Sequence, residues 1–91
     1  RVAVVGLMPD QVNAMRGRAL PEGMELVFVP KETSATELPP SADYAVLMSK
    51  WLPHRWQDGV YAQMPRDRVR LVAGGLSELT ATLRGLAANG R

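Results

Sequence analysis

The sequence predicts a small α/β domain in which a four-stranded, mainly parallel sheet is flanked by helices, as in Rossmann-like or flavodoxin-like folds. Short, mostly apolar runs recur at 2–7, 24–29, 43–48 and 69–73. Continuous apolar runs of this length are typical of strands that are covered on both faces. Between most of them, apolar residues return at helical spacing, which supplies the crossovers that parallel strands need.

The run at 2–7 is the first predicted strand, and a helix is expected to follow it. Pro9 and Asp10 mark its start, because proline is tolerated in a first helical turn and a carboxylate there meets the positive end of the helix dipole. An apolar stripe at helical spacing should face the core: Val12, Met15 and Ala19. The turn at 21–23 predicts that the helix ends at Leu20.

The second strand is predicted at 24–29 and the third at 43–48. The segment between them, 31–42, is rich in Ser, Thr and Pro, which is typical of a loop or one poorly formed helical turn. Parallel strands need a crossover of about a dozen residues. This segment is just long enough for an abbreviated crossover.

A second helix is predicted at 53–64, since Trp56, Val60 and Met64 recur at four-residue spacing and Pro65 closes the pattern. The fourth strand is predicted at 69–73. The last helix should begin at Ser77, whose hydroxyl can accept from free backbone N–H groups, and end at Asn89-Gly90. Its apolar stripe consists of Leu76, Leu79, Leu83, Leu86 and Ala87.

Length and composition indicate one domain, 1–91, of ordinary globular character, with 46% apolar and 22% charged residues. A chain this short buries a smaller share of its surface than a larger one does, so a homo-oligomer or a partner domain is expected. The sequence opens at Arg1 without an initiator Met, which leaves room for a longer polypeptide.

Several function classes lack their sequence signatures. There is no Cys, His54 is the only His, and no HExxH, GxGxxG, GxxxxGK[ST] or GxSxG motif is present. We therefore expect no metal, no cofactor and no catalytic residues, and hence a protein that is not an enzyme. No apolar run is long enough to span a bilayer, so a cytoplasmic protein without membrane contact is expected.

Two candidate anion-binding clusters follow the third and fourth strands. Both are expected at the carboxyl edge of the sheet, where open α/β folds bind ligands; glycines let the backbone approach an anion, and a helix start offers unpaired N–H groups. The candidate ligand-binding residues are Ser49, Lys50, His54, Arg55, Gly74, Gly75 and Ser77. The structural alternative is a tight strand-to-helix turn at the glycines and a solvated loop with a solvent-facing histidine.

Trp51 is a candidate protein-interface residue. On a helix, a side chain five residues from Trp56 points about 140° away from it. Because Trp56 belongs to the apolar stripe, Trp51 is expected to be partly exposed. There it could anchor a protein partner or stack on a base.

A second candidate site consists of arginines, which make up nine of the eleven cationic side chains. Five of them are expected to gather at the amino edge of the sheet as phosphate contacts for DNA or RNA: Arg16, Arg18, Arg66, Arg68 and Arg70. The alternative is a set of solvated charges, with Arg16 and Arg18 complementing a helix C-terminus and Asp67 partly neutralising its neighbours.

The second half of the chain carries a definite order of motifs. Asp43 opens an apolar strand, Pro53-His54 opens a helix, and a later strand ends in Gly-Gly-x-Ser-x-Leu at 74–79. This order resembles an uncharacterised family of small bacterial Rossmann-like domains, in which a Ser-His pair follows a central strand and a Ser stands near the start of the last helix. His54 and Ser77 match that pattern, whereas Pro53 stands where the family has its Ser. The resemblance implies a fold and a bacterial source more than an activity.

Receiver domains share the expected architecture but need an Asp at the end of the third strand. Here that strand ends in Met48-Ser49-Lys50. The essential residue of a receiver is therefore missing.

Three functions stay open at this point. The leading hypothesis is a non-catalytic, nucleic-acid-associated or regulatory binding module that self-associates. The second is a sensor domain or enzyme fragment that holds a small phosphorylated ligand at the carboxyl edge. The third is a structural domain that assembles through Trp51 and the sheet edges.

Overall fold

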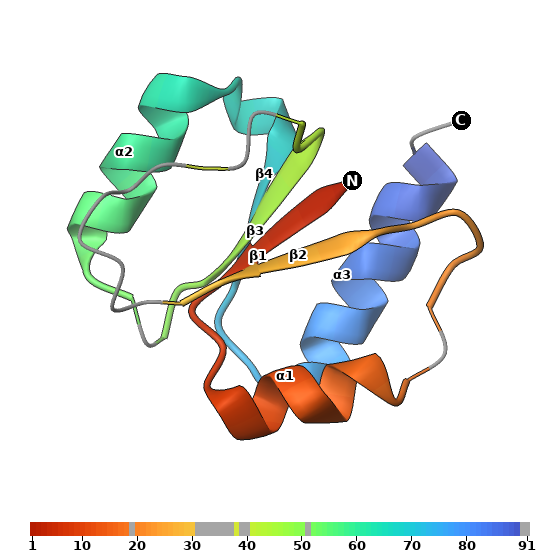
Figure 1. Ribbon diagram of the computed structural model, residues 1–91. Coiled ribbons are helices and arrows are strands. Elements are labelled where there is room, and N and C mark those ends of the chain that lie inside the picture. The colour runs from red at the N-terminus through yellow and green to blue at the C-terminus, as the bar shows by residue number, and fades with distance from the viewer. Residues whose placement is uncertain (19, 31–37, 39–40, 51, 90–91) are drawn as a thin grey trace.

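The chain forms a four-stranded, all-parallel sheet with helices on both faces (Figure 1). The computed structural model describes residues 1–18, 20–30, 38, 41–50 and 52–89. The strands are β1 (Val2–Val5), β2 (Leu26–Val29), β3 (Tyr44–Met48) and β4 (Val69–Val72). The helices are α1 (Pro9–Arg16), α2 (His54–Gln63) and α3 (Leu76–Asn89), with a short 3-10 helix, η1 (Arg66–Arg68), before β4. The predicted small α/β fold is confirmed.

The strand order is β2-β1-β3-β4. The first residue of β1, Val2, is in register with Leu26 of β2 on one side and with Tyr44 of β3 on the other. β3 continues the sheet to β4, with Ala45 opposite Val69. The order of the strands reverses between β1 and β3, so the topological switch point lies where these two strands end.

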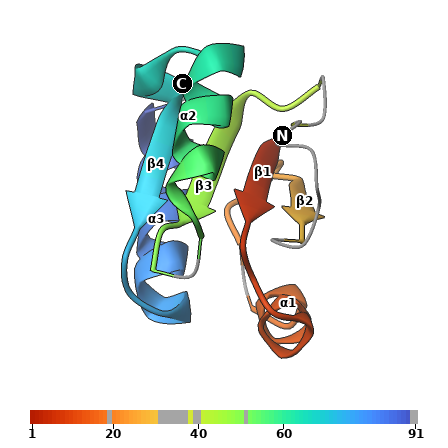
Figure 2. The ribbon, with the colours of Figure 1, turned by 90° about the vertical axis from the view of Figure 1, so that its left-hand side faces the viewer.

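One face of the sheet is covered by α1 and α3 (Figures 1 and 2). Side chains alternate between the two faces of a strand, and this face receives Val2 and Val4 from β1. The buried residues of this core are Val2, Val4, Leu7, Met15, Val46, Met48, Val72, Leu79, Leu83 and Leu86. Burial of the three α3 leucines in this list, and of Met15 on α1, holds both helices to the sheet.

The opposite face is covered by α2 (Figure 2). Trp56 and Val60 of α2 are fully buried there, and Met64, just past the helix, is half-buried. They pack against the other side of the sheet, through Val5, Ala45, Leu47 and Val69. The predicted stripe of α2 therefore does face the sheet.

The first helix is shorter than expected. It ends at Arg16 rather than Leu20, because Gly17 takes the C-cap position and its N–H donates to the carbonyl oxygen of Met15. Glycine is a poor helix residue, so the helix stops there although apolar residues continue. Leu20, beyond the helix, is half-buried and packs against the core below α1 and α3.

The last helix begins earlier than expected. Leu79 N–H donates to the carbonyl oxygen of Gly75 at 3.1 Å, which makes Gly75 the residue before the first helical turn. Ser77 lies inside the helix and is exposed, so the prediction that it caps α3 is wrong. Within the described residues, no helix is both long and apolar enough to cross a membrane.

Candidate functional site

The carboxyl edge of the sheet brings the two predicted clusters together, with Ser49 tied to the end of β4. The backbone N–H of Ser49 donates to the carbonyl oxygen of Val72 at 3.0 Å, and its hydroxyl donates to the same oxygen at 3.4 Å. The serine hydroxyl is therefore used within the sheet. Lys50, His54 and Arg55 are all exposed at the same edge.

Leu52 covers the topological switch point. Gly6, directly after β1, has a φ of +102°, and a Cβ built on it would lie 3.0 Å from Cγ of Leu52. Leu52 belongs to the loop after β3, so its side chain lies over the ends of the two strands where ligands of open α/β folds bind. A ligand at this point would have to displace a packed leucine.

The start of α3 holds a carboxylate of the chain itself. A Cβ on Gly74 would overlap with Oε2 of Glu78, so the exposed glutamate side chain folds back over the backbone of Gly74. A carboxylate is stabilised at the positive end of a helix dipole. An external anion at Gly74, Gly75 and Ser77 would compete with Glu78.

The amino edge carries three arginines from one short segment. The guanidinium of Arg66 lies over the ring of Tyr61, 4.4 Å from its centroid. Arg68 donates through Nη1 to the backbone oxygen of Asp43 at 3.5 Å. We call Arg66, Arg68 and Arg70 the arginine row.

Arg70, the third member of the row, folds back along its own strand. Its Nη1 donates to the backbone oxygens of Asp67 and Val69, at 2.6 and 3.1 Å. Asp67 therefore meets Arg70 through its carbonyl group. Among the described residues, no ion pair to a carboxylate is formed by any member of the row.

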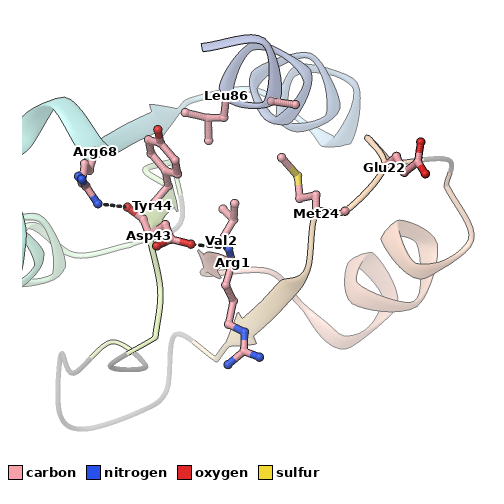
Figure 3. A pocket seen from close by; sticks show the side chains of 10 residues that line it. Arg1, Val2, Glu22, Met24, Asp43, Tyr44, Arg68 and Leu86 are labelled. Atoms are coloured by element: carbon pink, nitrogen blue, oxygen red, sulfur yellow. Dashed lines mark hydrogen bonds and ion pairs between the residues drawn. The ribbon is translucent and has the colours of Figure 1, made fainter. Parts of the chain in front are cut away.

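Two hollows open at the same edge, and Arg68 lines both. The main hollow, of about 430 Å³, lies between the starts of β1 and β3 and the end of α3 (Figure 3). The smaller hollow, of about 260 Å³, lies on the α2 side, where Met64 and Pro65 line it.

Asp43 stands between the two hollows and lines each of them. Its carboxylate accepts a hydrogen bond from the amino group of Arg1 at 2.8 Å. That hydrogen bond, the charge of the same amino group and the guanidinium of Arg68 hold the pKa of the Asp43 carboxyl below its usual range. The Asp43 carboxyl group is therefore ionised at neutral pH, and its negative charge lies near these positive groups.

Arg16 and Arg18 do not join the arginine row. The guanidinium of Arg16 lies 5.9 Å from the ring centroid of Phe28 in β2. Arg18 donates to the hydroxyl of Thr80 at 3.4 Å, near the start of α3. Because α1 ends at Arg16, it is the segment after the helix that runs back to the amino edge. The two arginines therefore stay beside α1 and α3.

Several residues at the amino edge were not found by sequence reasoning. Arg1 and Tyr44 line the main hollow, and Tyr61 supports Arg66. Tyr44, a polar aromatic residue at the first position of an otherwise apolar strand, was the one local signal available.

Trp51, the predicted interface residue, lies outside the described residues. Within the described part of the chain, no three carboxylate or imidazole side chains lie close enough together to form a metal site.

No family model, curated protein or solved structure was found to match this chain. The resemblance of its second half to small bacterial Rossmann-like domains therefore stays a prediction.

Proposed function

We propose that this domain is a non-catalytic, regulatory binding module for nucleic acid and that the arginine row is its phosphate-binding surface. The observation that best supports this is the kind of chemical group that contacts each of the three arginines. These groups are a tyrosine ring and backbone carbonyl groups, all uncharged. Such partners position a guanidinium without cancelling its charge; Arg68 in addition lies near the Asp43 carboxylate, whose pKa it lowers, so its charge is partly offset.

The chemistry of the row suits a polyanion. Each guanidinium has five N–H donors, and the hydrogen bonds described use at most two of them. The remaining donors can bind phosphate oxygens in the bidentate manner that favours Arg over Lys. Several arginines along one edge release counterions together when they meet a phosphate backbone.

Binding to labelled nucleic acid over a salt series tests this proposal. We expect affinity to fall steeply with salt, and each of R66Q, R68Q and R70Q to lower the slope of log K against log salt by about 0.7–0.9. R84Q on α3 is the matched control, since Arg84 is exposed and lies outside the row. It should leave the slope unchanged.

Two results of that experiment would contradict the proposal. One is an absence of binding even at low salt. The other is an equal loss of slope in R84Q and in the row variants, which would show attraction to the overall charge of +2 rather than to a site.

Self-association through β4 is a second candidate, and Leu71 favours it. β4 is an edge strand, and Leu71 is 46% exposed on it. The carbonyl oxygen of Val72 accepts a hydrogen bond from Ser49 and so points toward β3. Backbone groups alternate in direction along a strand, so those of Leu71 point outward, away from β3. An exposed apolar edge strand is a template for another chain.

Sedimentation over a concentration series tests this second candidate. The wild-type chain should shift from monomer toward a larger species as concentration rises, and L71K should stay monomeric with unchanged melting temperature. A strict monomer at high concentration would rule this candidate out.

The ligand-sensor alternative has weaker support, because Leu52 and Glu78 occupy the places where a phosphorylated ligand would sit. A cytoplasmic location belongs to the main proposal, since a regulatory nucleic-acid module must reach nucleic acid, whereas a bacterial source rests on the resemblance of the second half of the chain alone.

A further inference from the structure

We infer that the amino edge takes single-stranded nucleic acid, with one unstacked base in the main hollow and the neighbouring phosphates on the arginine row. This inference rests on the proposed function and adds the class of nucleic acid. It follows from the size of the hollow, from its lining and from its position beside the row.

The main hollow has the size and lining of a site for one small heterocycle. Its volume of about 430 Å³ lies within the range of ligand pockets, roughly 300–1,000 Å³. The half-buried Met24, Tyr44 and Ala87 supply apolar surface, and the buried core residues Val2 and Leu86 lie beneath them (Figure 3). Aromatic and apolar surfaces of this kind bind the faces of unstacked bases regardless of sequence.

The polar rim of the hollow carries groups of both charges. Asp43 accepts from the amino group of Arg1, and the guanidinium of Arg1 pairs with Glu25 at 2.9 Å. Glu22 adds a carboxylate and Arg68 a guanidinium (Figure 3). Such a rim offers donors and acceptors to an uncharged base edge, while the carboxylates disfavour a bare phosphate inside the hollow.

Arg68 connects the hollow to the phosphate-binding surface. It lines the main and the smaller hollow alike, and Arg66 and Arg70 flank it in sequence. A nucleotide combines a neutral heterocycle with an anionic phosphate, so a base in the main hollow would set its phosphate at Arg68. The bases of a duplex are paired and stacked inside it, and placing one in the hollow would require unpairing.

The test compares single-stranded oligothymidylate of about 12 nucleotides with a duplex of the same length, at one low salt concentration. We expect the single strand to bind about tenfold more tightly. A87L places a larger side chain in the hollow without changing any charge and should lower single-strand affinity about tenfold while leaving duplex affinity unchanged. A81L is the matched control, because Ala81 is an exposed α3 residue that does not line the hollow.

The outcomes separate this inference from the proposed function. Equal binding of single strand and duplex, lost in the arginine-row variants, would overturn the inference and leave the function standing. No binding of either nucleic acid would overturn both. Nuclear magnetic resonance gives a readout that needs no variant: the methyl signals of Leu86 and Ala87 should shift on addition of the single strand and not on addition of the duplex. Unshifted signals on saturation with the single strand would overturn the inference.

Discussion

Replacement of Gly6 by alanine is expected to lower the free energy of unfolding by about 1–3 kcal/mol. Gly6 has a φ of +102°, a conformation that residues with a side chain rarely adopt, and its missing Cβ leaves room for Leu52 at 3.0 Å. The variant has to strain its backbone and move a packed leucine at once. The larger side chain of G6V should have a larger effect.

Chemical denaturation of G6A beside G85A checks this expectation. Gly85 lies inside α3, and nothing stands within 4 Å of a Cβ built on it, so G85A should raise stability by about 0.5–1 kcal/mol. The same chemical change thus has opposite signs at the two sites. Unchanged stability of G6A would show that the contact between Leu52 and Gly6 is not tight.

Replacement of Trp56 by alanine should lower the free energy of unfolding by about 3–5 kcal/mol, the range for a large buried aromatic residue. Trp56 is 0% exposed and is the largest side chain in the core between α2 and the sheet. Its removal leaves a cavity against Leu47 and Val60 that a small domain cannot refill. W56A should be close to unfolded at room temperature.

W56F should be much milder than W56A. The indole N–H of Trp56 is buried and has no hydrogen-bond partner in the described part of the chain, and such a group costs about 1–3 kcal/mol. Phenylalanine removes that cost while keeping most of the apolar contact. H54A, two residues earlier on the exposed side of α2, is the control and should change stability little. Equal losses in W56F and W56A would contradict the account.

The fold class was predictable because the apolar pattern is local. Each strand is a short apolar run, and the stripe of α2, including Trp56 and Val60, repeats at helical spacing. The end of α1 was predicted wrongly because the pattern continues to Leu20, whereas Gly17 stops the helix. Leu20 still packs in the core, so apolar character alone did not distinguish a helical residue from a connecting one.

The two candidate sites differ in how far sequence could predict them. Arg66, Arg68 and Arg70 are close together in the chain, so they stay close in any fold that includes a strand there. The positions of Arg16 and Arg18 depend on where α1 ends and on the path of the segment after it. For these two, the expected common edge did not form.

The local apolar pattern specified the parallel α/β fold, and the short spacing of Arg66, Arg68 and Arg70 in the chain kept these three at one edge. Packing between separate elements set which edge is open. Leu52 covers Gly6 and the Glu78 side chain folds over Gly74 at the carboxyl edge, and the first of these contacts joins residues of separate elements that no sequence pattern pairs. Among the described residues nothing comparable fills the amino edge beside Arg68, where a hollow lies on either side of it. Which groups fill a crevice depends on side-chain packing across separate elements, and local pattern carries no information about that packing.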